Sequence, residues 1–241
     1  MDKISTGSFD LNDWLLGGYE KEIVTMIVGP AGSGKTNLTL LAACSQAKEN
    51  KVIYIDTEGG FSTERVKQIV GEENIEKVLE NILILNPTNF DEQKKAFKKL
   101  LDHVNKDQID LIVVDSIVML YRLELGDAIQ LKNEDKIKQV NRDVARQMRD
   151  LVEISRKQKI PILVTNQVYE DFLSFEDLQN NVEKKTNIVG GDLFKYWSKC
   201  IIELKHKGRT RKAILLKHRN IEEKEFNFEI KDKGIFKKRL F

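Results

Sequence analysis

The chain has 241 residues, of which 41% are hydrophobic and 32% charged, as in a globular protein with a highly charged surface. The formal net charge of +2 is too small to indicate nucleic-acid binding by itself, so any basic surface must be local. No apolar run approaches the roughly 20 residues that span a bilayer, and the N-terminus lacks a signal-peptide core. Cys44 and Cys200 lie far apart in apolar segments, so we expect a reduced protein of the cytoplasm, or of the nucleus where the host has one.

Eight apolar runs predict strands, and the first five are rich in Val and Ile, which is typical of strands covered on both faces. The runs are 23–28, 52–56, 82–85, 111–115, 162–165, 200–204, 213–216 and 226–230. Apolar residues at helical spacing predict helices over 89–104 and 133–158. This alternation predicts one α/β domain over 1–241, with a mostly parallel sheet between two layers of helices. From residue 200 on, two short strands flank a basic hairpin, so we expect antiparallel strands at the C-terminal end.

A phosphate-binding loop follows the first predicted strand, because the segment fits the pattern of Gly, four residues and Gly-Lys-Ser/Thr. Glycines let the backbone curl so that N–H groups point at a phosphate, and the helix that follows adds its positive end. We therefore predict an ATP site in which Lys35 reaches the β- and γ-phosphates and Thr36 binds Mg²⁺. The loop residues are Gly29, Pro30, Ala31, Gly32, Ser33, Gly34, Lys35 and Thr36.

Two carboxylates at strand ends complete the predicted site. Asp115 ends an apolar strand and is placed to hold Mg²⁺, directly or through water, although many buried strands end in Asp. Glu58 follows the strand at 52–56, and ligands of open α/β sheets bind at the carboxyl ends of the strands. Glu58 is therefore a candidate to position the water that attacks the γ-phosphate. The alternative for Glu58 is a carboxylate that caps a turn or a helix.

Four further segments, taken with the loop, resemble the RecA/RadA/Rad51 recombinase family: 4–7, 15–18, 56–59 and 165–168. The resemblance covers essentially the whole chain and implies a RecA-like P-loop ATPase core. It implies that Glu58, Lys35 and Gln167 are catalytic, with Gln167 sensing the γ-phosphate and signalling to the DNA-binding loop that follows. It also implies that Arg65 packs over the adenine, for which a planar guanidinium is suited.

The same resemblance implies that Lys217 and Arg219 form a basic pair that enters the ATP site of a neighbouring subunit. Such cations neutralise charge that develops on a transferred phosphoryl group. The alternative is a solvated strand end.

The chain departs from the recombinases in several segments. It starts almost directly on the core, so we expect neither an N-terminal helical DNA-binding domain nor the segment that docks on the next subunit. The first DNA loop is expected at 119–132, where Arg122 lies in a retained Arg-x-Glu and Asp127 replaces a basic residue. The second is expected at 169–191, and its first half is acidic.

Basic residues are instead concentrated in the C-terminal part of the chain. Tyr196 is next to some of them, and its ring is suited to stacking on a single-stranded base. A solvated, charged hairpin is the alternative, and Trp197 is expected in the core. The candidate contacts to DNA, or to a neighbouring subunit's ATP site, are Arg122, Lys205, Lys207, Arg209, Arg211, Lys217 and Arg219.

The residues and the resemblance predict an ATP-binding protein of DNA repair and homologous recombination. It would hydrolyse ATP weakly or under control of DNA, with Mg²⁺ as cofactor. It would bind single-stranded or branched DNA and no membrane. It would assist the main recombinase or other recombination proteins, such as a Holliday-junction resolvase, and a homodimer is left open. The alternatives are a nucleotide-gated binding module without meaningful turnover and a KaiC-like signalling ATPase.

Overall fold

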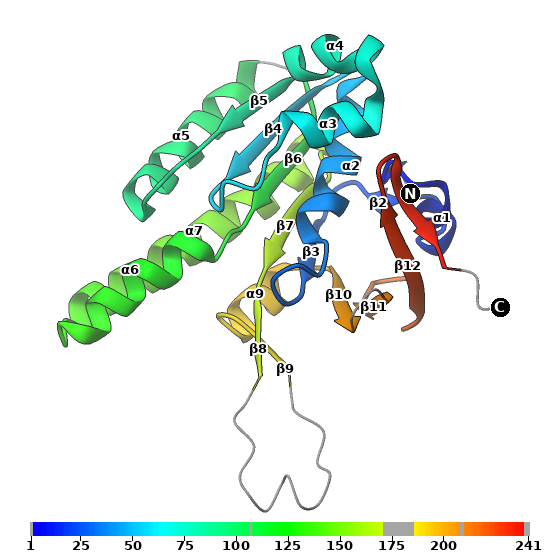
Figure 1. Ribbon diagram of the computed structural model, residues 1–241. Coiled ribbons are helices and arrows are strands. Elements are labelled where there is room, and N and C mark those ends of the chain that lie inside the picture. The colour runs from blue at the N-terminus through cyan, green and yellow to red at the C-terminus, as the bar shows by residue number, and fades with distance from the viewer. Residues whose placement is uncertain (1, 107, 171–185, 208–209, 239–241) are drawn as a thin grey trace, which may run out of the picture.

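The computed structural model describes residues 2–106, 108–170, 186–207 and 210–238. These residues form a nine-stranded sheet with the order β13-β12-β11-β10-β3-β7-β6-β4-β5 (Figure 1). Strands β10, β3, β7, β6, β4 and β5 run parallel, whereas β10 to β13 pair antiparallel, as predicted. The bounds are β3 (Val24–Val28), β4 (Lys51–Asp56), β5 (Ile82–Leu85), β6 (Ile109–Asp115), β7 (Ile162–Asn166), β10 (Cys200–Lys207), β11 (Thr210–Lys217), β12 (Glu225–Lys231) and β13 (Gly234–Lys237).

Helices cover both faces of the sheet and create two hydrophobic cores. In β4, Val52 and Tyr54 face one core while Ile53 and Ile55 face the other, which explains the uninterrupted apolar pattern. One core lies under α1 to α4, and the other lies under α5, α6, α7 and α9 (Figure 1). The helices are α1 (Phe9–Trp14), α2 (Lys35–Ala47), α3 (Thr63–Val70), α4 (Ile75–Glu80), α5 (Phe90–Lys106), α6 (Met119–Gln130), α7 (Glu134–Gln158) and α9 (Asp192–Trp197), with a 3₁₀ turn at Glu72–Asn74.

Two short ribbons lie outside the main sheet. Strands β1 (Lys3–Ile4) and β2 (Tyr19–Glu20) pair near the N-terminus. Strands β8 (Val168–Glu170) and β9 (Thr186–Ile188) pair directly after β7 and project from the body (Figure 1). The predicted second DNA loop therefore includes parts of both strands, and residues 171–185 lie outside the described part of the chain.

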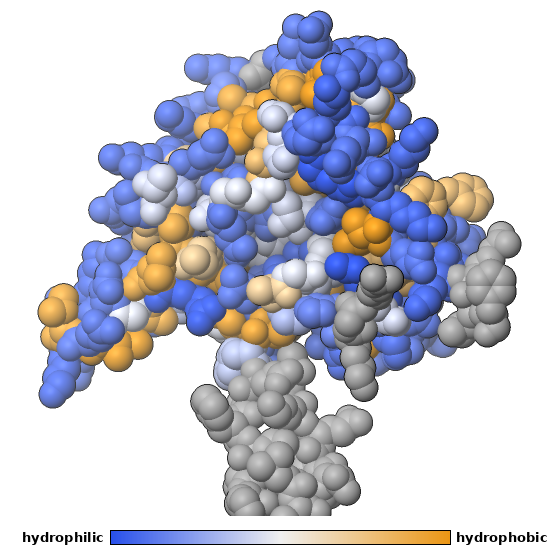
Figure 2. Space-filling view, in the orientation of Figure 1, coloured by the Kyte–Doolittle hydropathy of each residue, from blue (hydrophilic) through white to orange (hydrophobic). Residues whose placement is uncertain are grey.

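The prediction of a DNA loop at 119–132 is wrong, because α6 occupies nearly all of it. The segment contains strong helix formers, and Leu120, Tyr121 and Ala128 bury their side chains, so packing stabilises a helix despite Gly126. Arg122 consequently lies on a helix. Figure 2 shows apolar side chains gathered at the outer end of α6, where Ile129 and Leu131 are exposed.

The basic hairpin is present, but its strands are longer than predicted, since β10 and β11 take up most of the expected loop. No helix within the described ranges is long and apolar enough to cross a membrane.

Both cysteines are buried free thiols, and burial raises the pKa of Cys44 and of Cys200 to about 12. Because the thiolate is the reactive form, we expect the native protein to resist a thiol reagent such as DTNB at mildly alkaline pH. Both thiols should react at once after unfolding in guanidinium chloride. Rapid labelling of the native protein would contradict this packing.

Candidate nucleotide-binding site

The predicted phosphate-binding loop joins β3 to α2, as the motif requires. Gly34 has φ of +108°, a left-handed conformation, and a Cβ there would come within 2.8 Å of Ile230 Cδ1. A Cβ at Gly29 would come within 2.7 Å of the Leu204 backbone oxygen. Glycine is thus required at Gly34 by conformation and at Gly29 by space. Helix α2 begins at Lys35, so its N-terminal N–H groups point into the curl of the loop.

Lys35 is folded back onto this loop. Its Nζ donates to the backbone oxygens of Gly29 at 2.8 Å and Pro30 at 3.0 Å, and the residue is only 7% exposed. Burial lowers the pKa of Lys35, and the nearby carboxylates of Glu58 and Asp115 act in the opposite direction. The ammonium group is therefore poorly solvated, and a phosphate in the loop can replace its carbonyl partners.

Asp115 lies beneath the loop, nearly inaccessible to solvent. Its carboxylate accepts hydrogen bonds from the Tyr54 hydroxyl at 3.0 Å and from the hydroxyls of Thr165 and Thr36. Burial raises the pKa of Asp115, whereas these hydrogen bonds lower it. Asp115 and Thr36 therefore sit together, which is the pair of oxygen donors that we predicted for Mg²⁺.

Glu58 projects from a loop that Asp56 organises. The Asp56 carboxylate accepts from the backbone N–H groups of Glu58 and Gly60, both at 3.2 Å, and of Phe61 at 2.8 Å. No role for Asp56 was predicted from the sequence, although an Asp directly before a turn commonly accepts such bonds. We therefore regard Asp56 as a positioning residue for Glu58.

A chain of hydrogen bonds runs from Glu58 to α6. The Gln167 side-chain N–H donates to Glu58 Oε1 at 3.1 Å, and Arg122 Nη1 donates to Gln167 Oε1 at 3.0 Å. Residues predicted for catalysis and for DNA contact are thus directly connected.

A cavity of about 370 Å³ opens over the loop, within the roughly 300–1,000 Å³ range of ligand sites. The buried Ser33 hydroxyl also has no hydrogen-bond partner among the described residues. These features fit the triphosphate of a nucleotide. The lining consists of Ala31, Gly32, Gly34, Lys35, Thr36, Asn37, Glu58, Gln167, Arg211 and Ile230.

Arg65 does not line this cavity. Its guanidinium donates to Asn37 Oδ1 at 2.9 Å, to the Lys231 and Asp232 backbone oxygens at 2.9 Å each, and to Gln68 Oε1 at 2.8 Å. Arg65 therefore ties α3 to the turn between β12 and β13 at the rim of the site. Its packing over a base stays a prediction.

The predicted inter-subunit pair has partners within the chain. Arg219 Nε lies 2.7 Å from Glu20 Oε2, and Lys217 Nζ donates to the Lys195 backbone oxygen at 2.8 Å. Burial lowers the pKa of Lys217, as does the nearby Lys199. A role in a neighbour's site would require both side chains to leave these partners.

The hairpin cations are differently placed. Lys205 Nζ lies 3.4 Å from Glu203 and its side chain is more than half exposed, whereas Arg211 lines the nucleotide cavity. Only the backbone of Lys207 is described, and Arg209 lies outside the described residues. Tyr196 is 68% exposed with Lys199 Nζ 5.8 Å from its ring centroid, and Trp197 packs against the core as expected.

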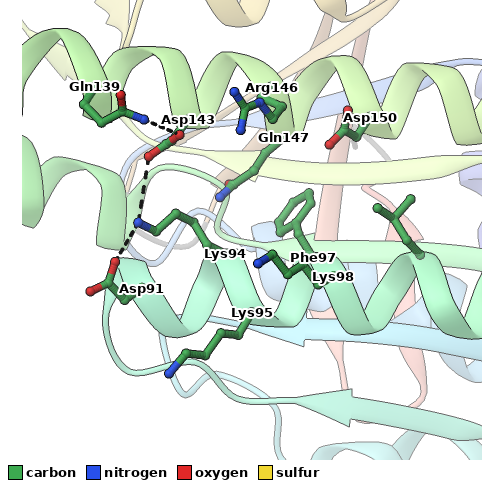
Figure 3. A pocket seen from close by; sticks show the side chains of 11 residues that line it. Asp91, Lys94, Lys95, Phe97, Lys98, Gln139, Asp143, Arg146, Gln147 and Asp150 are labelled. Carbon is green, nitrogen blue, oxygen red and sulfur yellow. Dashed lines mark hydrogen bonds and ion pairs between the residues drawn. The ribbon is translucent and has the colours of Figure 1, made fainter.

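A larger hollow of about 490 Å³ lies elsewhere, between α5 and α7 (Figure 3). Lys94 Nζ bridges Asp91 at 2.6 Å and Asp143 at 3.8 Å across it. The acidic and basic side chains that line this hollow thus largely neutralise one another, and none of the predicted site residues lines it. We assign it no catalytic role.

A phosphate loop after β3, with acidic and amide side chains at the ends of β4, β6 and β7, defines a P-loop nucleotide-binding protein with a RecA-like core. A crystal structure of the RadB recombinase matches with a TM-score of 0.74 and 32% identity, covering 96% of this chain and 98% of that one. The family model described as Rad51 matches residues 1–238. The chain belongs to the Rad51 family, whose members are ATPases.

Its relatives include proteins named DNA repair and recombination protein RadB. That of Methanobrevibacter smithii is 40% identical over 239 residues, which are 97% of this chain and 95% of that protein. That of Methanocaldococcus jannaschii is 40% identical over 225 residues, which are 93% of this chain and 98% of that protein. The resemblance seen in the sequence motifs is thereby confirmed.

Proposed function

We propose that this chain is a RadB-like protein of DNA repair and homologous recombination that binds Mg-ATP, hydrolyses it slowly and responds to DNA. Residues 1–241 would act as one RecA-like core. The observation that carries the proposal is the hydrogen-bond chain Glu58–Gln167–Arg122 beside the phosphate-binding loop. Through these two hydrogen bonds, a ligand that contacts Arg122 on α6 can affect Glu58, the residue that would position the attacking water.

Each side chain has a role that follows from its contacts. Lys35 would exchange the Gly29 and Pro30 carbonyls for phosphate oxygens, and Thr36 and Asp115 would hold the metal. Bound Mg²⁺ supplies charge neutralisation at the phosphates. Glu58 would orient the water and accept its proton, on a loop held by Asp56.

DNA is proposed to bind through Arg122, Lys205 and Tyr196, whose side chains are exposed. Phosphate contacts by Arg122 would compete with its bond to Gln167, and this would release Gln167 toward the nucleotide. The partners that we infer are single-stranded or branched DNA and a main recombinase or a Holliday-junction resolvase. A homodimer is left open.

One observation favours a second candidate, a nucleotide-gated binding module without meaningful turnover. The Gln167 side-chain N–H donates to Glu58 Oε1, and this hydrogen bond stabilises the carboxylate and so makes it a weaker base toward water. Nucleotide would then change Gln167 and the ribbon that follows it, and so gate a partner.

ATP turnover should be measured with and without single-stranded and branched DNA, across a salt series. We expect DNA to raise turnover, most strongly at low salt, where phosphate contacts are strongest. Arg122→Ala should remove at least half of that stimulation, and it should raise turnover without DNA, because it also frees Gln167 from its bond to Arg122. Arg142→Ala, an exposed arginine on α7, is the matched control.

Nucleotide-dependent DNA binding with negligible turnover would favour the binding module. Absence of DNA affinity even at low salt would contradict the first candidate and favour a signalling ATPase.

A further inference from the structure

The β10–β11 hairpin and β12 extend alongside the phosphate-binding loop because β10 pairs with β3. His206 and Arg211 are directly opposite each other in the antiparallel register, and Arg211 is opposite Phe228. Directly paired residues share a face of a sheet, and Ile230 is on that face as well, two residues beyond Phe228. One side chain from each strand, namely His206, Arg211 and Ile230, therefore faces the loop.

Contacts confirm that these side chains reach the loop. The His206 Nε2 atom lies 3.2 Å from the Ala31 backbone oxygen, and Ile230 is the side chain that a Cβ at Gly34 would meet. Arg211 and Ile230 both line the cavity over the loop, with Lys35 and Thr36. The hairpin is thus part of the wall of the nucleotide site.

Arg211 differs from Lys205 and Lys212, two other cations of the hairpin whose side chains are described. Lys205 is paired with Glu203, and Lys212 with Glu225 at 2.8 Å. The Nε of Arg211 is buried without a hydrogen-bond partner among the described residues. A guanidinium is always charged and presents a planar fork of donors that matches a phosphate. An unpaired, buried donor beside a phosphate cradle indicates a missing anionic acceptor.

We propose that Arg211 binds the phosphate chain of the nucleotide held by its own loop, and is not primarily a DNA contact. The inference rests on the proposed nucleotide binding and adds a cation from the same chain to the site. Bound nucleotide would then join the hairpin to the loop, alongside the His206 contact with Ala31.

The test is calorimetric titration of the full chain with Mg-ATP and with inorganic tripolyphosphate, which lacks a base. Arg211→Gln should raise both dissociation constants at least 10-fold. Lys212→Gln, next in sequence but on the opposite face of β11, should change neither by more than twofold. Arg211→Lys should give an intermediate value, because the charge remains but the fork is lost. Thermal melting should be similar for all variants without nucleotide.

A second measurement uses the unmodified protein. Phenylglyoxal labelling of Arg211, followed by peptide mass spectrometry, should be slowed by ATP, whereas labelling of exposed Arg142 should not be. Unchanged affinities in Arg211→Gln, or labelling indifferent to ATP, would overturn the inference. So would a variant that loses DNA binding but keeps its nucleotide affinity.

The two proposals fail differently. If Lys35→Ala abolishes nucleotide binding and Arg211→Gln does not weaken it, only the assignment of Arg211 is wrong. If the wild-type protein binds neither ATP nor tripolyphosphate, both the proposed function and the assignment of Arg211 are wrong.

Discussion

Lys35→Ala is expected to lower the affinity for Mg-ATP by about 100-fold or more, which is near the limit of detection. The Lys35 ammonium group already donates two hydrogen bonds to carbonyl oxygens of the loop, so it is held where a phosphate would sit. Its loss removes charge-assisted bonds to phosphate, which are worth roughly 1.5–3 kcal/mol each. The measurement is calorimetric titration with ATP and ADP.

Lys48→Ala is the matched control, because Lys48 is an exposed lysine at the opposite end of α2. It should bind nucleotide like the wild type. If the Lys35→Ala variant folds and keeps wild-type affinity for ATP, the nucleotide site lies elsewhere.

Glu58→Gln is expected to reduce ATP turnover by about 100-fold or more, the usual contribution of a general base. Glutamine keeps the shape of the side chain and can still pair with Gln167, but it cannot accept a proton from water. The affinity for Mg-ATP should stay within about threefold, because removing a carboxylate takes no attractive contact from the phosphates. Single-turnover hydrolysis and calorimetry on the same preparation separate the two effects.

Glu64→Gln provides a nearby control, since Glu64 is an exposed carboxylate in the first turn of α3. Equal and readily measurable turnover in wild type and Glu58→Gln would remove Glu58 from the chemistry, whereas negligible turnover in both would favour the binding module.

Local sequence was sufficient wherever a short segment determines its own structure. Gly29, Gly34 and Lys35 specify the loop, because its curl depends on the conformation of a few consecutive residues. The apolar runs specified the parallel strands, because a strand buried on both faces carries mostly apolar residues along its length. Segment 119–132 shows the limit, since a loop was inferred from family resemblance and the packing of Tyr121 and Ala128 stabilises a helix.

Side-chain partners could not be predicted in the same way. The resemblance implied that Lys217 and Arg219 enter a neighbouring subunit's site, with a solvated strand end as the alternative, and in the structure Glu20 and the Lys195 carbonyl engage them. Glu20 is distant from Arg219 in sequence, so the residues around Arg219 could not predict this ion pair. Ion pairing depends on which surfaces the fold brings together.

The sequence by itself determined that the chain has a phosphate-binding loop, a candidate metal-binding pair in Thr36 and Asp115, and a catalytic candidate in Glu58. Only the tertiary structure decided what surrounds them. Arg211 was predicted from the sequence to contact DNA. Because β10 pairs with β3, the hairpin lies beside the loop and Arg211 lines the nucleotide cavity. Contact between α6 and the end of β7 joins Arg122 to Gln167. The physical reason is that backbone conformation is encoded over a few residues, whereas the meeting of distant charges depends on strand order in the whole sheet.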